Sequence, residues 1–334
     1  MKINEAAEQL KKGNIKPVYL LAGAEDYLRS LALAIVLDNL HIEMQELNVT
    51  RHMKGNGLLA ALEGLPMMSE CRAVIATLDS LEPEEAKKLP AYLPQMPGST
   101  VLVLLKTGDK EAEKRAQGKA FKDLEAWVQK NGCVLDCATP KEAETADYLC
   151  GHAAKQGLKF SRTDAQYFCR YVSGGLSRLV RELNKLAAVC SGQITRADIQ
   201  KYASRSADFN VFALHELLLQ KKRGEAMDLV AEILEDDPNP VGLVSLLAGN
   251  FELMLIARAC ADARFRPDQI KKNVMEAGGA AEFRAERAIE QSRLMDAQAI
   301  RSALARLAKL DFDSKQGNVS LKTDLFAILC GIYV

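Results

Sequence analysis

The chain has 334 residues, of which 48% are hydrophobic and 26% are charged, a balance typical of globular proteins that bury sizeable cores. Its length suggests about two or three domains. Lys plus Arg and Asp plus Glu both number 44, and this zero net charge argues against a globally basic nucleic-acid binder. The N-terminus has no apolar signal region, and no run looks long enough to span a bilayer, so we expect a cytoplasmic protein with no membrane partner.

Neither the cysteines nor the histidines form a recognisable site. The eight cysteines contain no CxxC pair and match no zinc spacing, so small core residues are expected rather than a metal site or disulfides. The four histidines lie far apart, at His41, His52, His152 and His215. We therefore expect no metal ligands and no cofactor.

The first part of the chain alternates between apolar runs and helical segments. Strands are expected over residues 17–21, 44–49, 73–77, 100–105 and 133–136. Helices are expected over residues 5–12, 26–37, 58–62, 82–93 and 111–130. Because the strands are nearly continuous apolar runs separated by helices, they predict a parallel sheet that is covered on both faces.

The pattern changes at Thr139, which together with Pro140 and Glu142 predicts a helix start with a capping box. No convincing strand follows it. Ser161 and Thr195 are further expected N-caps. Residues 140–205 predict short helices. Longer helices are expected beyond a second boundary near 204–208, over residues 211–222, 223–234, 241–263, 292–310 and 318 onward, with a shorter pair across 267–290. The run 241–247 is apolar nearly all round, which predicts a buried central helix.

The turn after the first strand is where an α/β domain usually binds nucleotide phosphates. Here it contains Gly23, Ala24, Glu25 and Asp26. A phosphate-binding loop needs glycines, a Lys and a Ser or Thr, whereas this turn has one glycine, no Lys and two carboxylates that would repel phosphate. The pattern therefore predicts a degenerate, non-functional nucleotide turn.

Other catalytic patterns are missing as well. The sequence has no HExxH or GxSxG motif and no Cys/His arrangement at catalytic spacing. Its adjacent acids, such as Glu84 and Glu85, are expected on solvated surfaces. We therefore predict no catalytic residues, which favours an interaction protein over an enzyme.

The segment Leu65, Pro66, Met67, Met68, Ser69 places long apolar side chains in a connection between a helix and a strand, where polar residues are expected. Pro66 should stop the preceding helix. Methionine is flexible and adapts to apolar pockets. Two interpretations remain open: a protruding plug for a partner's pocket, or a segment whose methionines fold back and cap the core.

A basic stretch follows the strand at 100–105. Its cations could contact DNA phosphates, but interleaved acids cancel much of their field, which favours an ordinary solvated helix face. The members are Lys106, Lys110, Lys114, Arg115, Lys119 and Lys122.

Several stretches, in order along the chain, together resemble the delta-subunit family of the bacterial DNA polymerase III clamp loader. The segment from Leu65 to Arg72 is similar to the one written in that family most often as Leu-Pro-Phe-Phe-Ser and a basic residue, with Met67 and Met68 in place of the aromatics. The other matching stretches are Pro17–Leu28, Gly174–Leu176 with Leu179, Glu182, Leu183, Lys185 and Leu186, Ile194–Ile199, Asp208–Phe212 and Asp311–Lys315.

The resemblance implies an α/β plus all-α fold: an AAA+-like parallel-sheet domain over residues 1–139, a helical lid over 140–207 and a helical collar over 208–334. It implies a protein that binds the beta sliding clamp through Leu65–Ser69, opens the ring and helps load it on primed DNA without hydrolysing ATP. The implied partners are the gamma/tau and delta prime subunits in a five-membered ring. The protein would thus belong to a DNA-directed DNA polymerase holoenzyme.

Asp208, Phe209 and Asn210 are expected either as a hinge between lid and collar, or as an N-cap at Asp208 followed by core aromatics. Lys315 is expected to be solvated rather than bound to DNA. Two other functions remain as alternatives: an AAA+-type ATPase with a nonstandard nucleotide site, and a helical scaffold that has no role at a clamp.

Overall fold

The computed structural model describes residues 1–52, 57–108, 118–236, 240–278, 282–316 and 321–332. It divides the chain into two compact units. The first contains Met1–Thr145 and Gly175–Ser177, and the second contains Ala146–Gly174 and Arg178–Val334. The further division of residues 140–334 into a lid domain and a collar domain stays a prediction.

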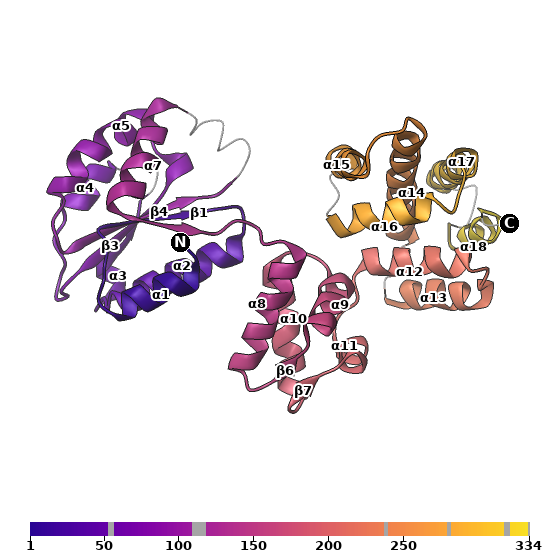
Figure 1. Ribbon diagram of the computed structural model, residues 1–334, viewed down its shortest axis with the longest axis horizontal. Coiled ribbons are helices and arrows are strands. Elements are labelled where there is room, and N and C mark those ends of the chain that lie inside the picture. The colour runs from indigo at the N-terminus through magenta and orange to yellow at the C-terminus, as the bar shows by residue number, and fades with distance from the viewer. Residues whose placement is uncertain (53–56, 109–117, 237–239, 279–281, 317–320, 333–334) are drawn as a thin grey trace. The chain divides into compact units, whose positions relative to one another are not determined.

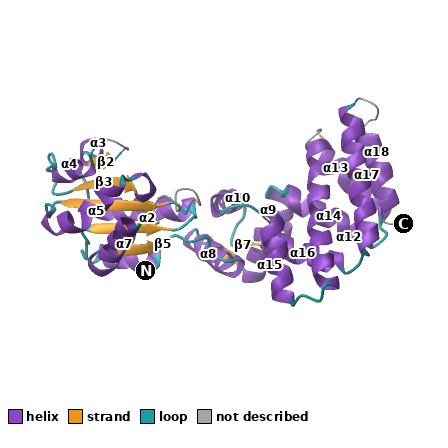
Figure 2. Ribbon diagram, turned by 90° about the horizontal axis from the view of Figure 1, so that it is seen from above, coloured by secondary structure: helices purple, strands orange, loops and turns teal. Residues whose placement is uncertain are grey.

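The first unit is built on a parallel sheet of five strands in the order β2-β3-β4-β1-β5 (Figures 1 and 2). The pairs β1–β4, β1–β5, β2–β3 and β3–β4 are all parallel. The strands are β1 Val18–Ala22, β2 Val49–Arg51, β3 Arg72–Thr77, β4 Thr100–Lys106 and β5 Cys133–Asp136. The helices are α1 Ile3–Lys11, α2 Asp26–Asn39, α3 Gln45–Asn48, α4 Leu58–Glu63, α5 Pro83–Tyr92 and α7 Lys119–Asn131, with 3-10 turns at Leu78–Ser80 and Leu93–Gln95.

Two hydrophobic cores lie on opposite faces of this sheet, because successive strand residues point to alternate sides. In β1, for example, Leu20 packs with α4, α5 and α7, whereas Tyr19 and Leu21 pack with α1 and α2. Figure 1 shows these two groups of helices on the two sides of the sheet. The strands are therefore apolar along their whole length, as the sequence predicted.

The second unit is mainly helical. Its central helix α14 packs against α12, α15, α16, α17 and α18 and supplies buried residues such as Leu247, Phe251 and Met254 to one large core. The helices that lie wholly or largely in this unit are α8 Glu142–Lys155, α9 Arg162–Val172, α10 Leu176–Val189, α11 Arg196–Tyr202, α12 Ala207–Leu219, α13 Arg223–Asp236, α14 Pro240–Asp262, α15 Pro267–Gly278, α16 Glu282–Ser292, α17 Ala297–Lys315 and α18 Leu321–Ile332.

The burial of α14 confirms the predicted central helix and corrects one expectation. By length and composition α14 is apolar enough to cross a membrane, so the prediction that no run is long enough was wrong. Its apolar residues instead pack into the core against neighbouring helices. The buried members include Leu243, Val244, Leu247, Phe251 and Met254. A helix that is apolar nearly all round is as typical of a protein core as of a membrane.

Three local predictions were wrong. Residues 45–48 form the short helix α3 rather than a strand, and only Val49–Arg51 pairs with β3. The helix expected to start at Thr139 begins instead at Glu142, so Thr139 does not cap it. The C-terminal part also contains two short strands, β6 Lys159–Phe160 and β7 Gln193–Ile194, which pair in parallel. Strands of two residues carry no periodic signal that a sequence could reveal.

The expected N-caps at Ser161 and Thr195 are confirmed. The Ser161 hydroxyl accepts the Asp164 N–H at 3.0 Å, and Thr195 forms a full capping box with Asp198. Ser206, rather than Asp208, caps α12 by accepting the Phe209 N–H at 3.1 Å. The N-cap expectation for Asp208 was therefore wrong by two residues.

Candidate functional site

The segment Leu65–Ser69 connects α4 to β3 and carries its apolar side chains on the surface. Leu65 is 74% exposed, Met67 is 59% exposed and Met68 is 76% exposed. Pro66 and Ser69 are half-buried. The methionines therefore do not cap the core, and the first unit presents a compact group of large apolar side chains to solvent, a feature that often marks an interaction site.

The backbone of this segment is fixed although its side chains are exposed. The buried Asn48 carboxamide accepts the Met67 N–H at 2.7 Å and donates to the Met67 carbonyl at 2.8 Å. The Ser69 hydroxyl accepts the Glu43 N–H at 3.2 Å and donates to the Cys71 carbonyl at 2.9 Å. These contacts tie the segment to the residues that precede β2, so its exposed side chains project from an anchored backbone.

Met68 adopts a left-handed backbone conformation, with φ of 53°. For a residue with a side chain this conformation costs roughly 1–2 kcal/mol, and it persists only where the surroundings impose it. The bonds at Met67 and Ser69 on either side impose it here. The backbone is thus held in an unfavourable conformation that leaves the Met68 side chain exposed.

Arg72 secures the stem of the segment at the start of β3. Its guanidinium donates to the Thr50 hydroxyl at 3.0 Å and lies directly against Gly64, where a Cβ would overlap it. A side chain at position 64 would therefore have to displace the guanidinium, which is the far end of a flexible side chain. The Arg that follows Leu65–Ser69 in the sequence thus acts as a structural support for the segment.

The predicted nucleotide turn, Gly23–Asp26, lies at the other edge of the sheet. Because all five strands are parallel, the turn after β1 is at their carboxyl edge, and Leu65–Ser69, which precedes β3, is at their amino edge. Gly23 has φ of 147°, and a Cβ there would overlap the Cys137 backbone. The turn is therefore packed tightly against the end of β5.

The polar groups of this turn bond to the protein itself. The Gly23 N–H donates to the Lys106 carbonyl at 3.3 Å and the Glu25 N–H to the Cys137 carbonyl at 3.0 Å. The Arg29 guanidinium donates to the carbonyls of Gly23 and Thr107 and pairs with Asp26. Amides that would have to face a phosphate are thus engaged, and the nearby cation is bound to a carboxylate and carbonyls.

The basic stretch after β4 is only partly described. Lys106, the last residue of β4, lies 2.7 Å from Glu125 of α7 in an ion pair. Lys110, Lys114 and Arg115 lie outside the described residues. Lys119 and Lys122 are in the first turns of α7. Among the residues that the structure describes, no three His, Cys, Asp or Glu side chains are placed to hold a metal ion.

Asp208, Phe209 and Asn210 lie in the first turn of α12, directly after the non-helical residues 203–206. Asp208 is 3.5 Å from Arg284 in an ion pair, and the Phe209 ring packs 5.0 Å from the Tyr171 ring. The three residues therefore link α12 to neighbouring helices. Their role as a hinge stays a prediction.

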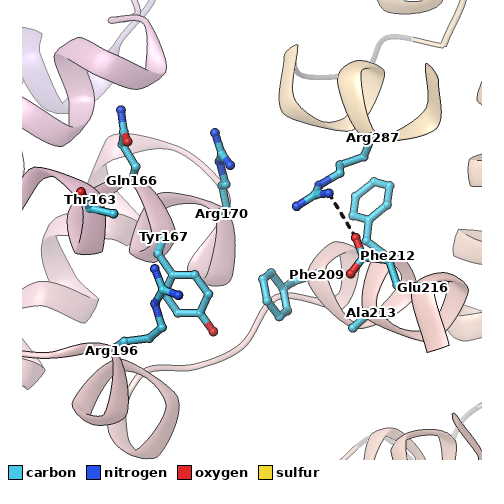
Figure 3. A pocket seen from close by; sticks show the side chains of 10 residues that line it. All are labelled: Thr163, Gln166, Tyr167, Arg170, Arg196, Phe209, Phe212, Ala213, Glu216 and Arg287. Atoms are coloured by element: carbon cyan, nitrogen blue, oxygen red, sulfur yellow. Dashed lines mark ion pairs between the residues drawn. The ribbon is translucent and has the colours of Figure 1, made fainter. Parts of the chain in front are cut away.

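Phe209 also lines a cavity of about 320 Å³ inside the second unit (Figure 3). Its charged groups are matched to partners: Arg287 lies 3.1 Å from Glu216, and Arg196 lies 4.5 Å over the Tyr167 ring. No motif in the sequence indicated this cavity, because its walls come from four separate helices. Lys315, on α17, pairs with Asp311 at 2.6 Å and is solvent-exposed, as expected.

The residue that sequence reasoning missed is Asn48. It is 1% exposed, and its partners at Met67 are 19 positions away along the chain. No local pattern distinguishes such an asparagine from a turn residue. A buried carboxamide that bonds the backbone of a distant loop is visible only once the chain is folded.

The fold is that of clamp-loader subunits. A solved structure, the Bacillus subtilis DNA clamp loader delta protein, superposes with a TM-score of 0.74, covers 99% of both chains and is 23% identical in sequence. The family model for the DNA polymerase III delta subunit matches residues 19–138, and the model for the C-terminal domain of the same family matches residues 208–329.

The chain belongs to the DNA polymerase III delta subunit family. A curated relative, DNA polymerase III subunit delta of Bacillus subtilis, is 26% identical over 326 residues, which cover 93% of this chain and 91% of the relative. The chain is thus a component of a DNA polymerase complex that acts in DNA replication, and its membership implies other clamp-loader subunits as partners. The predicted fold class is confirmed.

Proposed function

We propose that this chain binds the beta sliding clamp through Leu65–Ser69, stabilises an opened interface of the clamp ring and helps place the ring on primed DNA, without hydrolysing ATP itself. The observation that carries the proposal is the exposure of Leu65, Met67 and Met68 from an anchored backbone. A few well-packed side chains near the centre of an interface supply most of its binding energy.

The opening of the ring follows from differential binding. A partner shifts an equilibrium between closed and open rings only by the difference in its affinity for the two states. Met67 and Met68 would anchor the chain in an apolar pocket of the clamp, while a neighbouring helix of the first unit strains the closed interface. Methionine fills such a pocket but is more flexible than an aromatic ring, so more side-chain entropy is lost on binding.

The internal hydrogen bonds of the turn Gly23–Asp26 support the absence of ATP hydrolysis. Its amides bond to Lys106 and Cys137, and its carboxylates would repel a triphosphate. ATP turnover in the assembled loader would therefore come from other subunits. We place this chain with gamma/tau and delta prime subunits in a five-membered ring in the cytoplasm, with Asp208–Asn210 as the hinge between its lid and collar.

The test is the affinity of the full-length chain for the purified sliding clamp, measured by calorimetry. In the Met67→Ala/Met68→Ala variant the affinity should fall about 100-fold, the loss expected for a truncated apolar anchor. Leu294→Ala is the matched control, because Leu294 is 69% exposed but lies in the second unit. Equal clamp affinity of wild type and the double variant would refute the anchor.

Ring opening needs its own measurement. Fluorophores on the two sides of a clamp interface should separate when wild-type chain is added and should separate less at the same concentration of Met67→Ala/Met68→Ala. ATP titration of the isolated chain separates the proposal from the ATPase alternative, since a working site gives saturable binding and turnover.

A further inference from the structure

Asn48 is a buried polar residue whose hydrogen bonds join two separate surface segments. Its Nδ2 donates to the Glu43 carbonyl and to the Met67 carbonyl, both at 2.8 Å. Its Oδ1 accepts the Met67 N–H at 2.7 Å. Both N–H groups of the carboxamide and one oxygen lone pair are therefore committed to backbone atoms of the two segments.

The first of these segments, residues 43–48, is itself apolar at the surface. Met44 is 45% exposed and Leu47 is 51% exposed. Met44 has φ of 47°, so it shares the left-handed conformation of Met68. The segment also bonds to the other through the Glu43 N–H, which donates to the Ser69 hydroxyl at 3.2 Å.

We propose that Met44 and Leu47 form a second half of the clamp-docking surface and that Asn48 is the positioning residue that joins this half to Met67 and Met68. This inference rests on the proposed function. Its occupant is the apolar surface of the sliding clamp around the pocket that receives the methionines, because the second half is continuous with the first at the amino edge of the sheet.

The arrangement explains why an unfavourable backbone is retained at two exposed methionines. Neither Met44 nor Met68 gains core packing from its left-handed conformation, because both side chains face solvent. A surface that is already ordered in the free protein loses less conformational freedom on binding. The hydrogen bonds of Asn48 therefore lower the entropic cost of docking rather than contributing a contact to the clamp.

The first arm of the test removes the carboxamide. Asn48→Ala leaves the Met67 N–H and carbonyl without their partner, and clamp affinity should fall about tenfold or more. Asn39→Ala is the matched control, because the Asn39 carboxamide bonds within its own helix, to the Ile35 carbonyl at 2.8 Å. Asn48→Asp, which keeps the size of the residue but loses both donors, should weaken binding in the same direction.

A double-mutant cycle separates positioning from a general loss of structure. Asn48→Ala should cost less affinity in a Met68→Ala background than in wild type, because the side chain that it positions is already gone. Equal losses in the two backgrounds would show that Asn48 acts elsewhere. The fluorescence of Trp127, the single tryptophan, reports whether the first unit of each variant is folded.

The second arm changes only exposed side chains, so it remains decisive if Asn48→Ala does not fold. Met44→Ser/Leu47→Ser should weaken clamp binding about tenfold, as expected for the loss of two partly buried apolar contacts. Ile15→Ser is the control, because Ile15 is 45% exposed in the same unit. If Met44→Ser/Leu47→Ser bound the clamp as tightly as wild type does, the inference would be overturned.

The outcomes distinguish this inference from the function on which it rests. If Met67→Ala/Met68→Ala binds the clamp as wild type does, the proposed function fails. If that variant is weakened while Met44→Ser/Leu47→Ser is not, the proposed function stands and the second half of the surface does not exist. If sedimentation shows that Met44→Ser/Leu47→Ser abolishes self-association and leaves clamp affinity unchanged, a second copy of the chain is the occupant and the inference is overturned.

Discussion

The turn Gly23–Asp26 and the segment Leu65–Ser69 are two connections of one parallel sheet, at its opposite edges, and they are built in opposite ways. In the turn, amides, a guanidinium and carbonyls bond to one another and the backbone packs against β5. In the segment, the backbone is also bonded, but large apolar side chains remain in solvent.

The two edges of this α/β unit therefore present different surfaces to a ligand. At the carboxyl edge, where this type of fold usually takes a phosphate, internal hydrogen bonds engage the amides of Gly23 and Glu25. The amino edge, which in such sheets is seldom the ligand site, then presents an apolar surface. Substitutions in the turn should therefore change stability, whereas substitutions in the segment should change binding.

The largest effect is expected for Gly23→Ala. A Cβ at this position would overlap the Cys137 backbone, and φ of 147° is itself unfavourable for alanine. The first unit should lose about 3 kcal/mol or more of unfolding free energy, measured by urea denaturation followed by Trp127 fluorescence. Gly13→Ala is the control, because Gly13 also has positive φ, 76°, but apart from its chain neighbours no atom of the described residues lies within 4 Å of its Cβ position. Equal losses for the two variants would show that the turn is not tightly packed.

Arg29→Ala should have the next largest effect. The substitution leaves the carbonyls of Gly23 and Thr107 without their charged donor, which should cost about 2 kcal/mol. The same Trp127 denaturation experiment measures it. Arg51→Ala, at an exposed position on β2, should stay within about 0.5 kcal/mol of wild type. If Arg29→Ala were as stable as Arg51→Ala, the guanidinium would not hold the turn closed.

A third effect concerns pH. Burial raises the pKa of the Cys137 thiol from its ordinary 9.0 to about 11, so the folded state keeps a proton that the unfolded state loses. Stability from this group is full below pH 9 and is lost as pH rises through 11. Between pH 7 and pH 10 wild type should lose about 1.4 kcal/mol more than Cys137→Ala. Parallel pH profiles of the two proteins would contradict this assignment.

The smallest stability effect should come from Met67→Ala/Met68→Ala, although its effect on clamp binding should be the largest. Exposed side chains contribute little to folding, so the unfolding free energy should stay within about 0.5 kcal/mol of wild type. Trp127 fluorescence in urea measures it. A loss above about 1 kcal/mol would mean that the methionines support the core, which would remove the contrast with the turn.

Sequence reasoning predicted those parts of the fold that repeat a pattern. The apolar strands β1, β3, β4 and β5 and the helices between them follow from periodicity, and α14 follows from its apolar circumference. The position of Leu65–Ser69 followed from apolar residues in a connection. Its exposure did not, because whether Met67 faces solvent or the core is decided by Asn48, which is 19 positions away.

The same limit explains the wrong strand at 44–49. Met44 and Leu47 resemble strand residues, but the left-handed backbone at Met44 and the hydrogen bonds of Asn48 turn the chain into α3 before β2 begins. The bonds of Asn48 to Met67, 19 positions away, come from tertiary structure, and they override the local preference of the side chains. The helix start at Glu142 rather than at Thr139 is another case in which a local cap signal was not used.

The exposed thioethers of Met67 and Met68 have a chemical consequence. Peroxide converts accessible methionine into a sulfoxide, which is polar and would enter an apolar pocket poorly. Met254, buried in the core of the second unit, is protected from the same reagent. A family member with phenylalanine at these two positions would be insensitive to this reaction. On the proposed function, clamp binding by this chain would become sensitive to oxidants and would recover when the sulfoxides are reduced.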